Sequence, residues 1–189
     1  MCHALLQDIK FFELLLLIDQ ELARQVRATG CPCGGPLHRA NYPRKPRACL
    51  KAIRSSYETR FSFCCRVCRK RLTSASVRFL GRRVYLGLAV VLMSARRAGP
   101  TSCLNRVAQG LGLPVRTLLR WHHWWRDQFP KSRFWQANCG RFMPSLGVTV
   151  LAASLLEHFS GTTELQLHRL LFFLSPITVG HPLTLREGH

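Results

Sequence analysis

Two close pairs of cysteines are the residues of this sequence whose type and spacing predict chemistry. Cys31 and Cys33 flank a single proline, and Cys65 and Cys68 enclose two residues. Two such pairs, each on a tight turn, can bring four thiolates onto one tetrahedral zinc ion, which stabilises a small fold because the unfolded chain has no preformed site. Glycines that follow the first pair supply the backbone freedom that such a turn needs. We therefore expect a structural zinc site formed by Cys31, Cys33, Cys65 and Cys68.

Neighbouring residues offer alternative ligands. Cys64 stands directly beside Cys65 and could replace it, and His38 or Cys49 could replace Cys33. Buried free thiols are the other interpretation, since cysteine packs as a small apolar residue. A catalytic zinc is not expected, because it would require His or carboxylate ligands and an open position.

A second pattern, from Leu104 to Trp125, is typical of a helix-turn-helix unit. Such a unit needs a small residue where its helices meet, a glycine in the turn and an apolar anchor in the second helix. Ala108, Gly112 and Leu118 stand at those relative positions. Proline suits the start of a helix, where a missing N–H does no harm, and it precedes the second helix here.

The second helix of this unit also predicts a DNA-reading face. Leu118, Trp121 and Trp125 have helical spacing and define its core side. The predicted DNA contacts on this helix are Arg116, Thr117, Arg120, His123 and Arg126. In a helix-turn-helix such residues face the major groove, and the last of them would reach a phosphate. Basic side chains around the cysteine pairs would grip the DNA backbone; they are Arg39, Arg44, Lys45, Arg47, Arg69, Lys70 and Arg71.

The charge of the chain agrees with both patterns. There are 28 Lys and Arg residues against 9 Asp and Glu, which gives a formal net charge of +19. Such a field attracts polyanions, of which nucleic acid is the commonest. A transposase core would need about three carboxylates around two metal ions, and the acids of this chain are too scattered for that. We therefore predict DNA binding without catalysis.

These residues must be positioned by a mainly α-helical fold with a small β zinc ribbon. We expect four parts: an N-terminal helix in 1–29, a zinc-ribbon-like module in 30–81, a three-helix helix-turn-helix unit in 82–128, and a C-terminal helical segment with a tail in 129–189. The first helix should run over 4–28 and stop at Gly30. Its better apolar stripe is Leu15, Ile18, Leu22 and Val26, which would pack on the ribbon or form a dimer seam.

The remaining helices follow from the same patterns. Residues 82–97 would form the third helix of the helix-turn-helix unit, and 151–159 and 165–174 two short helices separated by Gly161. The longest apolar runs fall short of the roughly 20 residues of a membrane span, and no signal peptide is recognisable. We therefore expect a cytoplasmic protein, where paired cysteines indicate metal more often than disulfides.

With these motifs, the chain resembles bacterial mobile-element proteins in which a zinc ribbon precedes a helix-turn-helix. The strings that carry the resemblance are GCPCGGPLHRANYPRKPR, RFSFCCRVCRKR, SVRFLGRRVY and VAQGLGLPVRTLLRWHHWW. In such proteins the first cysteine pair more often reads Cys-x-x-Cys, one residue longer than here.

The resemblance implies a sequence-specific, transposase-related DNA-binding protein of the nucleoid, an accessory or regulator without its own catalytic core. Its expected partners are DNA and a second copy of the chain or a transposase. Two alternatives stay open: an adaptor whose zinc ribbon docks another protein, and a degenerate transposase fragment.

Overall fold

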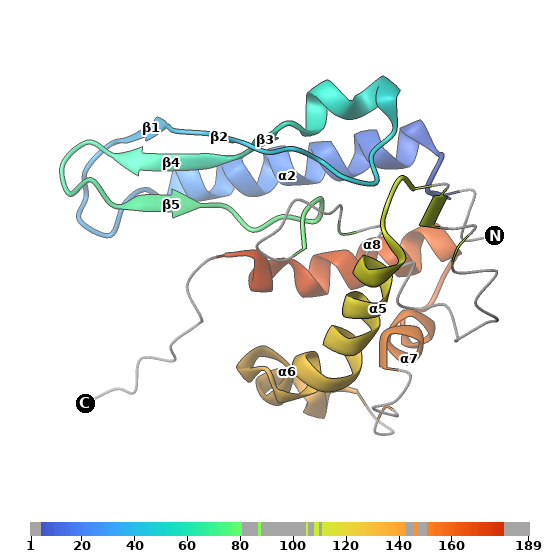
Figure 1. Ribbon diagram of the computed structural model, residues 1–189. Helices are drawn as coiled ribbons and strands as arrows, with labels where there is room; N and C mark the ends of the chain where they lie inside the picture. The colour runs from blue at the N-terminus through green and yellow to red at the C-terminus, as the bar shows by residue number, and fades with distance from the viewer. Residues whose placement is uncertain are drawn as a thin grey trace.

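A long N-terminal helix runs alongside a small antiparallel sheet. The shorter helices of the C-terminal half lie together on one side of both (Figure 1). The computed structural model describes residues 5–80, 87, 105, 108–109, 111–142, 146 and 151–179. The predicted class, mainly α-helical with a small β part, is confirmed for these residues. Apart from Gly87, the predicted helix over 82–97 lies outside them.

The N-terminal helix, α2, spans Ile9–Thr29, close to the predicted 4–28. The carboxylate of Asp8 caps the start of this helix by accepting hydrogen bonds from the N–H groups of Lys10 and Phe11. Gly30 ends it with φ +78°, a conformation that glycine adopts without a steric penalty.

The predicted apolar stripe matches only part of the buried face of α2. Its buried residues are Phe11, Phe12, Leu15, Asp19 and Ala23, whereas the other three residues of the predicted stripe are half-buried. The buried face of α2 therefore contains the carboxylate of Asp19. A pattern based on apolar residues alone predicts that an acid is exposed.

Three short strands form the ribbon. They are β1 (Leu37–Arg39), β4 (Ser62–Cys65) and β5 (Arg71–Thr73), antiparallel in the order β1-β4-β5. Leu37 pairs with Cys65 across β1 and β4, which places the first cysteine turn beside the second.

A second, smaller pairing extends the ribbon. Strand β2 (Tyr42–Pro43) pairs with β3 (Thr59–Arg60), and the 3₁₀ helix Lys51–Tyr57 lies between them in sequence and contacts α2. The Tyr57 hydroxyl donates to the Phe12 carbonyl at 2.5 Å, so this helix is fastened to α2 by a buried hydrogen bond.

A buried ion cluster joins α2 to the base of the ribbon. Asp19 is fully buried and accepts hydrogen bonds from the Ser76 hydroxyl (2.5 Å), the Val77 amide (2.7 Å) and Nε of Arg78 (2.7 Å). A guanidinium nitrogen of Arg60 lies 3.9 Å from the same carboxylate. The charge of Asp19 is thus compensated inside the core, as a buried charge requires.

The two arginines of the cluster are themselves almost fully enclosed. Arg78 donates to the carbonyls of Ser56 (2.9 Å) and Thr59 (3.2 Å), and its Cζ lies 4.8 to 5.1 Å from three aromatic ring centroids. Arg60 donates to the Ser74 carbonyl (2.6 Å) and the Thr178 hydroxyl (3.1 Å). Thr178 ends the final 3₁₀ turn of the described chain, so the C-terminal part of the fold completes this cluster.

The remaining helices surround an aromatic core. They are α5 (Val115–His123), which continues as a π turn (Trp124–Gln128) and a 3₁₀ turn (Phe129–Lys131); α6 (Arg133–Asn138) with a 3₁₀ turn (Cys139–Arg141); α7 (Leu151–His158); and α8 (Thr163–Leu174) with a final 3₁₀ turn (Ser175–Thr178). Trp125, Phe129, Trp135, Phe142 and Phe173 form a chain of ring contacts with centroids 4.8 to 5.5 Å apart. The two predicted C-terminal helices are confirmed, with Gly161 at φ +114° between them.

Among the described residues, no helix has the length and apolar character needed to cross a lipid bilayer.

Candidate metal centre and basic surfaces

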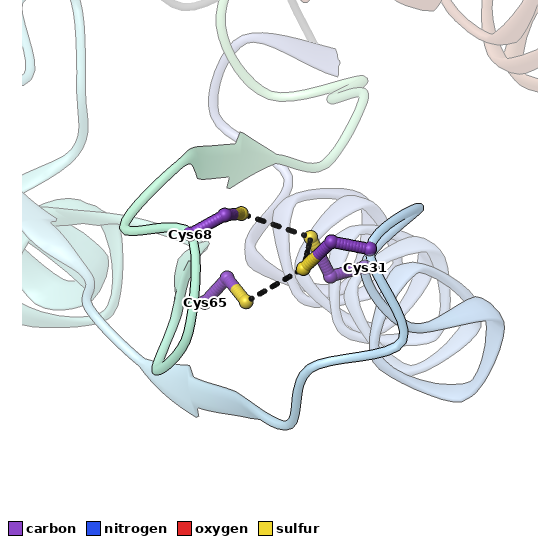
Figure 2. Close-up of side chains that lie close together, drawn as sticks. Cys31, Cys65 and Cys68 are labelled. Atoms are coloured by element: carbon purple, nitrogen blue, oxygen red, sulfur yellow. Dashed lines mark hydrogen bonds between the residues drawn. The ribbon is translucent and has the colours of Figure 1, made fainter.

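Four cysteine sulfurs from the two predicted pairs come together at the end of the ribbon. The Sγ atoms of Cys31, Cys33, Cys65 and Cys68 all lie within 4.8 Å of one another. Three of the separations are short: 3.4 Å for Cys31–Cys33, 3.4 Å for Cys33–Cys65 and 3.5 Å for Cys31–Cys68. Figure 2 shows the sulfurs of Cys31, Cys65 and Cys68 pointing toward one another. Zinc–sulfur bonds of about 2.3 Å in a tetrahedron put the sulfurs about 3.8 Å apart, so this cluster could hold a metal ion.

The first cysteine turn achieves this with a single residue between its cysteines. The Gly34 amide donates to the Cys31 carbonyl at 2.8 Å, and Gly34 has φ +76°. Gly35 packs so tightly that a Cβ atom there would lie 2.7 Å from Sγ of Cys65 and 2.8 Å from a methyl of Val67. The two glycines thus close the turn and allow the two turns to approach.

The second turn is a backbone loop at the end of β4. The Arg69 amide donates to the Cys65 carbonyl (3.1 Å), and the Cys65 amide donates to the Lys70 carbonyl (3.0 Å). Arg69 has φ +60°, a backbone conformation that residues other than glycine rarely adopt. The Arg66 amide donates to the Pro36 carbonyl (3.0 Å), which ties this turn to the first.

The alternative ligands lie outside the sulfur cluster. Cys64 is the strand neighbour of Cys65 and therefore points to the other face of β4, where its thiol contacts the Arg69 carbonyl at 3.5 Å. His38 is the partner of Cys64 in the pairing of β1 with β4. The Cys49 thiol contacts the Leu50 carbonyl at 3.6 Å. The structure thus places Cys65, and not Cys64, in the cluster.

Two thiols of the cluster differ in acidity when no metal is bound. The Gly35 amide and the neighbouring thiols lower the pKa of Cys33 to about 6. The Cys33 amide lowers the pKa of Cys31, but burial and the hydrogen bonds with the other thiols outweigh it and raise that pKa to about 12. The two thiols of the first turn therefore differ in how readily they lose the proton that a metal ion would displace.

The predicted reading face of α5 is exposed at four of its five positions. Arg116, Arg120, His123 and Arg126 are exposed, whereas Thr117 is 2% exposed and so does not lie on that face. Thr117 is buried because it flanks Leu118 and is one helical turn from Trp121, so the buried stripe is wider than predicted.

Two features of this face were not predicted. Leu119, which is 54% exposed, stands beside Arg120 among the cations. The Asp127 carboxylate accepts from Arg126 (2.9 Å) and lies 2.6 Å from Nδ1 of His123, so both side chains already face an acid.

The turn before α5 has the predicted local geometry. Ala108 is 4% exposed, Gly112 has φ +61°, and the Leu113 amide donates to the Ala108 carbonyl at 2.9 Å. Most of the preceding helix and the third helix of the unit fall on residues outside the described ranges. The helix-turn-helix unit as a whole therefore stays a prediction.

The basic side chains of the ribbon lie at its surface. Arg44 is half-buried, and the exposed ones are Arg39, Lys45, Arg47, Arg69, Lys70 and Arg71. Between residues 30 and 80 the one acidic residue is Glu58, and none of the ion pairs among the described residues involves these cations. Their charge is therefore available to a partner.

Comparison with protein-family models, with curated proteins and with solved structures finds no match to this chain.

Proposed function

We propose that this protein binds duplex DNA sequence-specifically, held in shape by a structural zinc ion, as an accessory or regulatory protein of a bacterial mobile element without catalytic activity of its own. The observation that carries the DNA-binding part is the surplus of exposed cations without acidic partners on the ribbon. The mobile-element part rests on the resemblance of the sequence motifs.

The chemistry of the four ligands supports zinc. Four thiolates around one point suit zinc among the common cellular metals, since calcium and magnesium prefer oxygen ligands. Cys31, Cys33, Cys65 and Cys68 would fill all four positions of a tetrahedral ion and leave none for substrate. Such an ion would lock the two turns together and so hold the surrounding arginines in place.

The exposed face of α5 would supply sequence recognition. Arg116 and Arg120 are exposed without an ion pair among the described residues, and a guanidinium can bind the O6 and N7 edge of guanine with two hydrogen bonds. Arg126 would contribute less, because it would first have to leave Asp127.

The first experiment combines metal content with DNA binding. Zinc is measured in purified protein, and binding to duplex DNA is followed by fluorescence anisotropy between about 50 and 200 mM salt. We expect one zinc per chain, and an affinity that falls about a thousandfold or more if roughly six or more phosphates are contacted. An interaction with nearly constant affinity over this range would instead indicate the protein-binding adaptor.

Charge-matched variants separate recognition from general attraction. Arg116→Ala with Arg120→Ala should reduce the preference for a selected site over random duplex by about tenfold or more. The control, Arg24→Ala with Arg27→Ala, removes the same charge from the exposed side of α2. If both pairs lower binding to all duplexes equally, α5 does not read bases. Arg126→Ala should have the smallest effect of the α5 variants.

A further inference from the structure

Two arginines from different parts of the ribbon lie on one tyrosine ring. Cζ of Arg44 is 4.6 Å from the ring centroid of Tyr42, and Cζ of Arg71 is 5.6 Å from it. Arg44 follows β2 and Arg71 begins β5, so the fold brings these cations together from positions far apart in the sequence.

A hydrogen bond to the ribbon holds the Arg71 guanidinium, whereas the Arg44 guanidinium makes only a longer contact with the tyrosine hydroxyl. Nη1 of Arg71 donates to the Ala40 carbonyl at 2.6 Å, and Nη2 of Arg44 contacts the Tyr42 hydroxyl at 3.4 Å. The Arg44 backbone is held by its amide, which donates to the Glu58 carbonyl. These contacts leave Nε and the other terminal nitrogen of each guanidinium without a partner among the described residues.

Two arginines held on one ring are preorganised to bind a phosphate group. A cation–π contact restricts where a guanidinium lies, and the N–H groups that remain free can bind two phosphate oxygens. A side chain that is already fixed loses less conformational entropy when it binds. No carboxylate pairs with either arginine among the described residues.

We infer that Tyr42, Arg44 and Arg71 form a phosphate clamp, and that its occupant is the sugar-phosphate backbone of duplex DNA. This inference rests on the proposed function and deepens it, because it assigns the backbone contact to one preorganised cluster. A phosphodiester is favoured over a small anion because an exposed lysine is the chain neighbour of each arginine, Lys45 beside Arg44 and Lys70 beside Arg71.

The test compares zinc-loaded variants in duplex binding by fluorescence anisotropy over a salt series. Tyr42→Leu removes the ring without changing the charge, and we expect duplex affinity to fall about fivefold to thirtyfold. Tyr42→Phe keeps the ring and should bind within about twofold of the natural chain. An equal zinc content in all variants shows that the ribbon stays folded.

A charge-matched pair completes the test. Arg44→Ala with Arg71→Ala should lower the slope of log affinity against log salt by about 1.8. Lys51→Ala with Arg66→Ala removes the same charge from exposed ribbon positions that are not assigned to DNA, and it should lower the slope by less.

Three results would overturn the clamp. The first is Tyr42→Leu binding as tightly as the natural chain, and the second is equal losses for the two double variants. The third is millimolar inorganic phosphate displacing the duplex at constant ionic strength from the natural chain but not from Tyr42→Leu, which would make a small anion the occupant. Absence of duplex binding by the natural chain would instead refute the proposed function, and the clamp with it.

Discussion

Replacing the buried carboxylate of α2 should destabilise the whole fold. Asp19→Asn keeps the shape of the side chain but removes the negative charge that faces Arg78 at 2.7 Å and Arg60 at 3.9 Å. The amide nitrogen would also face the donors of Ser76 or Arg78 if it occupied the position of Oδ2. Two guanidinium groups that are 0% and 3% exposed would then lack a counter-charge.

The expected magnitude follows from this burial. Removing one partner of a buried ion pair costs about 3–5 kcal/mol, against a total stability of about 5–15 kcal/mol for a folded domain. With a urea dependence of about 2 kcal/mol per molar, the unfolding midpoint should fall by about 2 M. The assay is urea unfolding of the zinc-loaded protein followed by circular dichroism.

An exposed acid on the same helix provides the control. Glu21 pairs with Arg24 at 2.6 Å, but the two side chains are 48% and 74% exposed. Glu21→Gln should therefore change the free energy of unfolding by less than about 1 kcal/mol. If Asp19→Asn unfolds within about 0.5 M urea of the natural chain, the buried cluster does not contribute as argued.

Three further predictions concern the metal site and the response to pH. Cys65→Ser should lower the zinc content from one per chain toward none while Cys64→Ser retains it, and equal losses would return Cys64 to the ligand set. Gly35→Ala should weaken zinc binding by about tenfold or more in a chelator competition, because its Cβ would lie 2.7 Å from the Cys65 sulfur; Gly34→Ala meets no atom within 4 Å and should strain the backbone with a smaller effect on the metal. Burial lowers the pKa of His122, so the folded protein favours the neutral imidazole. The stability that this group contributes is present above the pKa of the unfolded chain, near 6.5, and is lost as pH falls. His122→Gln should therefore flatten the fall in melting temperature between about pH 7 and 5, and an unchanged fall would contradict this.

The four-cysteine cluster could be predicted from the sequence because each turn is local. The two cysteines of each pair, Cys31 with Cys33 and Cys65 with Cys68, are only two or three positions apart. This spacing alone indicates that both sulfurs of a pair can bind the same metal ion. The choice between Cys64 and Cys65 required the strand register, since adjacent residues on a strand point to opposite faces.

The buried carboxylate could not be predicted in the same way. A search for apolar periodicity treats every acid as outward, and Asp19 is inward because Arg78, 59 residues further along the chain, compensates its charge. The contact of Arg71 with the Tyr42 ring likewise depends on a pairing of strands that no local pattern specifies. Thr117 was assigned to the DNA face for a related reason, since the width of a buried helical stripe is set by the elements that pack on it.

The contact between Arg60 and Thr178 has a consequence for synthesis of the chain. These residues are 118 positions apart, and Thr178 also accepts the Ser76 amide at 3.0 Å through its hydroxyl. A ribosome releases the ribbon well before it releases Thr178, so a nascent chain can bring its four cysteines together while the base of the ribbon still lacks this partner. Nascent chains released after residue 174 should therefore resist a protease less well at the ribbon base than chains released after residue 179.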